Sequence, residues 1–94
     1  MAKKRERLEV IYDILYSVME HRNAIKPTRL LYSSNLSPQM FKDYVDELQT
    51  KGFLQLKNED EGKRTYSLTT KGFEFLQKYK TILAFIQDFG LWVT

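Results

Sequence analysis

The chain has 94 residues, with 15 lysines and arginines against 12 aspartates and glutamates and no cysteine, which gives a formal net charge of +3 at pH 7. This length allows one hydrophobic core, and 43% hydrophobic with 29% charged residues is typical of a globular domain, which excludes a largely disordered chain. The absence of cysteine excludes disulfides and thiolate metal sites, and without a signal-peptide pattern or a run of ~18 apolar residues we expect a soluble, cytoplasmic protein.

The first predicted element is an amphipathic helix over residues 4–22. Apolar side chains recur at steps of three and four between Leu8 and Met19, which is the spacing of one helix face. Asn23 marks its end. Pro27 favours an extended backbone for residues 24–26, and this short piece could pair with a later strand.

A basic cluster precedes that helix. It consists of Lys3, Lys4, Arg5 and Arg7. Residues 1–29 carry seven lysines and arginines against four acids, and the sequence pI is near 9.2. A basic balance favours an anionic partner without requiring one, so the cluster is either a solvated surface or a contact for nucleic acid.

Two further helices follow. Residues 28–32 are predicted to form a short second helix, closed by the polar residues 33–35. Ser37 and Pro38 start a third helix, because a serine N-cap accepts hydrogen bonds from free backbone amides and proline at the first position sacrifices no donor. Apolar residues at helical spacing continue to Leu48, and Lys51 with Gly52 ends the helix.

A hairpin and a long helix complete the chain. Residues 53–57 and 65–68 read as strands on either side of the polar tract 58–64, so a hairpin with a mobile tip is predicted. Residues 69–72 cap a final helix, whose apolar positions begin at Phe73.

The final helix has apolar residues on two adjoining stripes, and a small core can cover only one of them. The first, heptad-like stripe comprises Leu76, Tyr79, Leu83, Ile86 and Val93. The second comprises Phe75, Ile82, Phe85, Phe89 and Trp92. We therefore predict a homodimer formed through this helix. Its predicted interface is Leu76, Tyr79, Leu83, Ile86, Phe89 and Val93.

An amphipathic helix lying on a membrane surface is a weaker explanation of the two stripes. Such helices carry lysine and arginine close to their aromatic residues, whereas no cation follows Lys80 and Asp88 is present. The aromatic end, residues 89–93, is instead expected to tuck against the partner subunit or back onto the first helix.

This order of elements is typical of the winged helix-turn-helix, an α+β fold that is mostly α, here with a long C-terminal dimerisation helix. Residues 1–70 would form the winged helix-turn-helix domain, and residues 71–94 the coiled-coil dimerisation helix with its aromatic tail. The third helix would be the recognition helix and the hairpin the wing. The fold favours binding to double-stranded DNA, with protein docking as the alternative.

Three segments also carry a resemblance. Residues 7–15, residues 28–32 with 35–37, and residues 66–72 resemble a small archaeal winged-helix family of abundant chromatin-associated DNA-binding proteins from Sulfolobales. The resemblance implies dimers in which the long C-terminal helices pair as an antiparallel coiled coil, with the two winged-helix domains at opposite ends. The density of aromatic residues from 85 to 92 departs from a regular coiled coil.

The candidate DNA contacts are basic or polar side chains, or lie on the outward half of the third helix. They are Lys3, Lys4, Arg5, Arg7, Arg29, Ser33, Ser34, Ser37, Gln39, Met40, Lys42, Lys63 and Arg64. Gln39 and Lys42 are the predicted groove contacts, because glutamine suits adenine and lysine suits guanine or a phosphate. The acids at residues 59–61 oppose the positive charge of the wing and leave its contact open. Few outward side chains suit base readout, so we expect largely sequence-tolerant binding.

An enzyme is not expected. The chain has a single histidine, His21, which we interpret as capping the first helix or as solvated, and it has no glycine-rich phosphate loop. Asp43, Asp46 and Glu47 could hold a cation, but a solvated acidic face that includes Lys42 explains them better. The sequence therefore predicts no cofactor, no metal and no small-molecule ligand.

Overall fold

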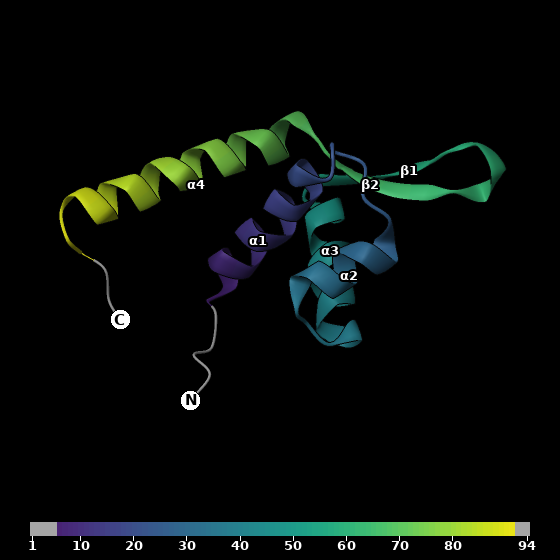
Figure 1. The fold of residues 1–94 in the computed structure, drawn as a ribbon, viewed down its shortest axis with the longest axis horizontal. Helices are drawn as coiled ribbons and strands as arrows, with labels where there is room; N and C mark the ends of the chain where they lie inside the picture. The colour runs from purple at the N-terminus through teal and green to yellow at the C-terminus, as the bar shows by residue number, and fades with distance from the viewer. Residues whose placement is uncertain (1–5, 92–94) are drawn as a thin grey trace.

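The computed structural model describes residues 6–91, and in it a fourth helix extends away from three packed helices and a hairpin (Figure 1). The elements are α1 (Arg7–Glu20), α2 (Pro27–Ser34), α3 (Pro38–Thr50), β1 (Leu54–Asn58), the short 3-10 turn η1 (Asp60–Gly62), β2 (Arg64–Leu68) and α4 (Thr70–Asp88). This is the predicted order, and the mostly helical winged helix-turn-helix fold is confirmed. We call the part from α1 to β2 the head.

The core lies where α1, α2 and α3 meet the base of the hairpin. Its most deeply buried members come from four parts of the chain: Ile14, Leu15 and Val18 of α1, Ile25, Leu30 of α2 and Leu48 of α3. Strand residues Leu54 and Leu68 close it, and α4 adds Leu76, which is 4% exposed. Among residues 6–91, no helix is long and apolar enough to cross a membrane.

The connection from α1 to α2 is fixed by backbone geometry. The helix ends at Glu20 instead of at residue 22, because Arg22 and Asn23 have φ values of 59° and 57°, which are left-handed. The side chain of Asn23 accepts a hydrogen bond from the backbone N–H of Leu68 at 2.6 Å. Ile25 then forms an antiparallel bridge with Tyr66, so the predicted pairing of this extended piece with a later strand is confirmed.

The second helix is longer than predicted. It continues through Ser33 and Ser34, whose hydroxyls donate back to carbonyl oxygens one turn earlier in the helix. The prediction that these serines lie in the turn before α3 was therefore wrong. Short hydroxyl side chains suit both a helix end and a turn, and here Asn35 makes the turn with a φ of 58°.

Both ends of α3 follow the predicted local signals. The Ser37 hydroxyl accepts a hydrogen bond from the Met40 N–H at 3.2 Å. At the other end Gly52 has a φ of 82°, and the N–H of Phe53 donates to the carbonyl of Leu48 at 2.8 Å. This glycine-terminated pattern ends the helix sharply and directs the chain into β1.

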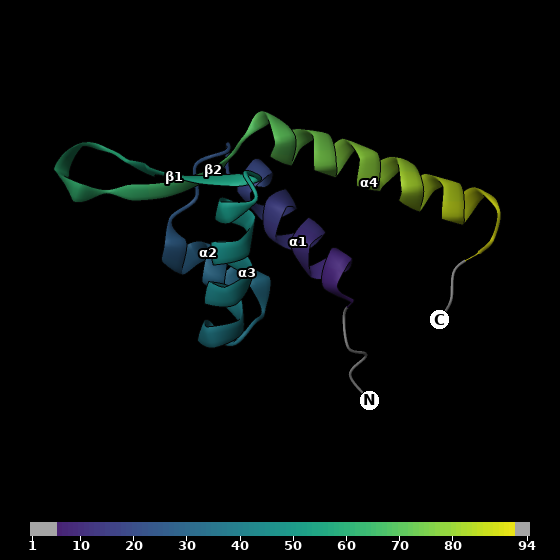
Figure 2. The ribbon, with the colours of Figure 1, turned by 180° about the vertical axis from the view of Figure 1, so that it is seen from behind.

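The hairpin pairs Leu54 with Leu68 at its base and Asn58 with Arg64 near its tip. Each strand extends one residue nearer the tip than predicted. The N–H of Glu59 donates to the carbonyl of Lys63 at 2.6 Å, and this bond closes the tip around η1. The hairpin extends to one side of the three packed helices α1 to α3, and α4 extends to the other side, in two opposite views (Figure 1 and Figure 2).

The start of α4 lies tightly against the hairpin. The Thr69 hydroxyl accepts a hydrogen bond from the Gly72 N–H at 3.1 Å. Gly72 is buried, and a Cβ built on it would overlap the carbonyl oxygen of Phe53 and come within 3.3 Å of Leu68. Only glycine therefore fits this approach of helix to strand.

Aromatic rings line the contact between α1 and α4. Tyr12 stacks on Tyr79 with ring centroids 4.7 Å apart, and Phe75 stacks on Tyr79 at 5.8 Å. Leu76 lies beside them in the core. The predicted interface was wrong at Leu76, because packing against α1 has covered that side of α4 within the subunit.

The two stacked phenols give a prediction for alkaline pH. Burial is the main cause that raises the pKa of both Tyr12 and Tyr79, and nearby negative charges raise it further. An unfolded phenol ionises at a pKa of about 10, so the stability linked to the raised pKa is present below that pH and is lost as pH rises through the folded value. We expect the free energy of unfolding in urea to fall above about pH 10, and to fall less in Y12F/Y79F. The control is Tyr32→Phe at an exposed site, in which the fall should be as large as in the wild-type chain. If the free energy of unfolding of Y12F/Y79F fell as much as that of this control, the prediction would be contradicted.

Candidate nucleic-acid interface

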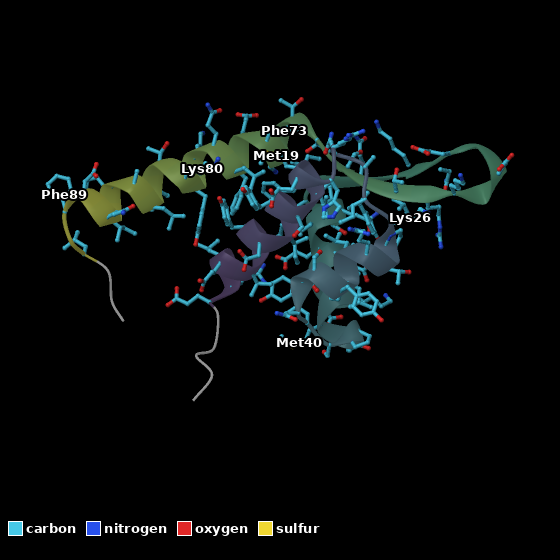
Figure 3. The ribbon with its side chains drawn as sticks, in the orientation of Figure 1. Met19, Lys26, Met40, Phe73, Lys80 and Phe89 are labelled. Carbon is cyan, nitrogen blue, oxygen red and sulfur yellow. The ribbon has the colours of Figure 1, made fainter. Side chains whose placement is uncertain are left out.

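The N-terminal half of α3 presents polar and flexible side chains to solvent. Gln39 and Lys42 are exposed, and Met40 is 47% exposed at the end of α3 away from α4 (Figure 3). Phe41 and Val45 face the core. A helix with one buried and one exposed face, started by a serine cap, can enter a groove without losing its own packing.

The polar side chains on this face bond to each other. The Gln39 amide donates to the Asp43 carboxylate at 3.0 Å, and Lys42 donates to Asp46 at 2.8 Å. The hydrogen bond with Asp46 is the main cause that raises the pKa of Lys42. Both side chains chosen as groove contacts therefore have partners within α3.

Arg7 joins α1 to α3. Its guanidinium forms an ion pair with Glu47 and lies 5.9 Å from the ring centre of Tyr44. Glu47 also accepts from Lys51 at 2.7 Å. Arg7 thus has a structural partner, while Lys3, Lys4 and Arg5 lie outside the described residues.

The serines of α2 differ in what they can reach. Ser34 is 1% exposed, donates to the carbonyl of Leu31 at 2.7 Å and accepts from the N–H of Leu36. Because it is buried, the Ser34 side chain cannot contact DNA at the surface of the head. Ser33 and Ser37 are exposed.

An open pocket of about 600 Å³ lies where the end of α1 meets the start of α2. We call it the α2 pocket, and its lining residues are His21, Lys26, Thr28, Arg29, Tyr32 and Ser33. Arg29 and Ser33 were predicted from sequence as DNA contacts, whereas Lys26, Thr28 and Tyr32 were not. One signal could have found them, because no aspartate or glutamate lies between Glu20 and Asp43.

His21 occupies the C-terminal cap of α1, as predicted. Its Nδ1 lies 2.8 Å from the carbonyl oxygen of Ser17. A carbonyl oxygen can only accept, so Nδ1 of His21 donates this hydrogen bond. Within residues 6–91, no group of three or more histidines or carboxylates could hold a metal ion.

The tip of the hairpin carries both signs of charge. Lys63 and Arg64 are exposed there, and so are Glu59 and Glu61. Carboxylates therefore offset the cations at the tip, whereas no carboxylate of the described residues lines the α2 pocket.

The distal half of α4 exposes large apolar side chains. Ile82, Phe85 and Phe89 are 54%, 56% and 66% exposed, and the rings of Phe85 and Phe89 lie 4.8 Å apart. We call these three residues the outer stripe. Leu83 and Ile86 are half-buried, and Trp92 and Val93 fall outside the described residues.

Comparisons with known proteins agree with this geometry. A family model described as winged helix-turn-helix matches residues 4–87. An uncharacterized protein of Methanocaldococcus jannaschii is 37% identical over 79 residues, which are 78% of each chain. A second uncharacterized protein of that archaeon is 29% identical over 83 residues, a match that covers 88% of this chain but 36% of that longer protein.

Solved structures with the same fold include two proteins at 22% sequence identity. One is Sso10a-2, described as a DNA-binding protein from Sulfolobus solfataricus, with a TM-score of 0.73 over 90% of this chain and 85% of that one. The other is F-93 of SSV1, with a TM-score of 0.65 over 95% of this chain and 99% of that one.

Proposed function

The chain belongs to the winged helix-turn-helix family, and from this membership we propose that it binds double-stranded DNA as a homodimer. The observation that carries the proposal is the exposed, serine-capped N-terminal half of α3 at the end of the head away from α4 (Figure 3). In a helix-turn-helix the second helix of the pair enters the major groove, and here that helix is α3. The DNA-binding description of Sso10a-2, which shares the fold, adds support.

The proposed contacts divide into two kinds. Gln39 and Lys42 would reach base edges, where glutamine suits adenine and lysine suits guanine. Phosphates would be held by the other exposed candidates, which neutralise charge without reading sequence. Among the described residues these are Arg29, Ser33, Ser37, Lys63 and Arg64. Lys3, Lys4 and Arg5, which lie outside the described residues, are proposed as further phosphate contacts from the sequence alone. With few side chains aimed at bases, the binding would depend little on sequence.

The proposed dimer is formed through α4. The outer stripe leaves three large apolar side chains in water on a helix that extends beyond the head (Figure 1). Covering apolar surface gains ~25 cal/mol per Å², and a second copy offers a matching stripe. In an antiparallel pair the two heads would lie at opposite ends and could contact DNA at two places.

A role on the chromosome in the cytoplasm, as an organising protein or a regulator of transcription, follows from this proposal. The two roles differ in how bound sites are distributed. Mapping the bound sites across the genome separates them, because many sites without a shared motif indicate an organising protein and a few matched palindromes indicate a regulator.

The direct test is the salt dependence of binding to a labelled DNA duplex. Each phosphate contact contributes about −0.9 to the slope of log affinity against log salt, so for about six contacts we expect a slope near −5 and a loss of about 10³-fold between 50 and 200 mM salt. Fluorescence anisotropy with a random-sequence duplex measures both.

Protein docking is the second candidate, and the acids on α3 favour it. Asp43, Asp46 and Glu47 share the outward side of this helix with two lysines, so the face is not basic. Absence of duplex binding at low salt would contradict the DNA proposal and favour docking of another protein chain on the same face.

A further inference from the structure

The two helices of the helix-turn-helix differ in whether their cations are paired with carboxylates. On α3 both Lys42 and Lys51 bond to carboxylates. At the start of α2, Lys26 and Arg29 are exposed, and neither forms an ion pair with another described residue. The unneutralised cations of this part of the chain therefore lie on α2.

These cations line a pocket together with neutral side chains. Thr28 adds a hydroxyl group to the wall of the α2 pocket, Ser33 adds one that donates to backbone carbonyls of α2, and Tyr32 adds a ring that is 81% exposed. A guanidinium and an ammonium beside the Thr28 hydroxyl suit an anion with several oxygen acceptors, and phosphate is such a group. The exposed ring of Tyr32 offers apolar surface for the sugar next to that phosphate.

The position of the pocket relates it to the proposed DNA surface. Lys26 lies on the side of the head from which the hairpin extends (Figure 3). The helix α2 lies next to α3 in both ribbon views (Figure 1 and Figure 2). When the second helix of a helix-turn-helix enters the groove, the first crosses the sugar-phosphate backbone. A duplex held by α3 would therefore bring its backbone past the α2 pocket.

We infer that the α2 pocket is the main phosphate-binding site of the described residues, where Lys26 and Arg29 bind a phosphodiester of the duplex. The inference rests on the proposed DNA binding. Lys26 and Arg29 supply the charge, because they are the lysine and the arginine that line the pocket, whereas Nδ1 of His21 is already bonded to the carbonyl of Ser17. The lysines of α3 contribute less to affinity, since each must first leave its carboxylate.

The test removes the two cations and measures the salt slope again. In K26A/R29A each chain loses two phosphate contacts, so we expect the slope of log affinity against log salt to become shallower by about 1.8 for each bound head, or about 3.6 for a dimer bound through both heads. The charge-matched control is K78A/K80A on α4, which we expect to change the slope by less than about 0.5. All four side chains are exposed, and circular dichroism checks that both variants remain folded.

The outcomes distinguish this inference from the proposed function. If the wild-type chain binds duplex and K26A/R29A keeps the wild-type slope of log affinity against log salt, the phosphate-binding site is disproved while DNA binding stands. If the wild-type chain does not bind duplex at low salt, both fail. A saturable change in the Tyr32 NMR signals with inorganic phosphate, which duplex does not displace, would assign the pocket to a free anion and overturn the inference.

Discussion

Substituting Ile82 and Phe85 by lysine is expected to convert the proposed dimer into a monomer. Both side chains are more than half exposed in the single chain, and each would contribute about 1.5–3 kcal/mol when buried by a partner. Lysine at these positions would place charge in an apolar interface, which is costly without a partner. Light scattering should then give the mass of one 11.2 kDa chain instead of two.

The same variant should bind DNA much more weakly. Two heads joined in one molecule gain 10²–10⁴-fold in affinity over one head, so we expect a loss of about 100-fold although two cations per chain have been added. The matched control is A84K/Q87K, which adds the same charge to exposed positions on the opposite side of α4. A I82K/F85K chain that stayed dimeric would disprove pairing through the outer stripe.

Replacing Gly72 by alanine in the first turn of α4 is expected to destabilise the protein. Alanine normally favours a helix over glycine by about 1 kcal/mol, but here its Cβ would overlap the backbone oxygen of Phe53, which cannot rotate away as a side chain would. Overpacking of this kind costs about 1–3 kcal/mol, so after the gain in helix propensity we expect a net loss of about 1 kcal/mol. The melting temperature should fall by about 4–8 °C for each kcal/mol.

The control for this prediction is Thr70→Ala in the same turn of α4. Thr70 is exposed, so alanine there should keep or slightly raise the melting temperature. If Gly72→Ala melted at the same temperature as Thr70→Ala, the close approach of α4 to the hairpin would not be as tight as the structure has it. Because Gly72 also sets the direction in which α4 leaves the head, a shift there should change dimer geometry.

Local signals made most of the fold predictable. Ser37 with Pro38, and Lys51 with Gly52, act on neighbouring backbone groups, so the two ends of α3 could be located from sequence. The boundary of α2 could not be located in this way. Ser33 continues a helix that contacts both α1 and α3, and those contacts are tertiary.

Features formed by distant segments were harder to predict. Two apolar stripes on α4 were visible in the sequence, but which of them α1 covers depends on the angle at which α4 leaves the hairpin, so Leu76 was assigned to the wrong surface. Lys26 was treated as part of an extended connection. Its place in a pocket with Tyr32 follows from the turn at Asn23, which folds the chain back.

The hydrogen bonds within α3 limit how sharply the protein could choose between base pairs. Gln39 and Lys42 already hold Asp43 and Asp46, so a side chain that turns to a base edge exchanges one partner for another and leaves a carboxylate facing the duplex. The preference for a matching base should then be smaller than the ~1–3 kcal/mol of a good bidentate contact. Such a helix is suited to occupying a large number of positions along a genome and poorly suited to finding a single one.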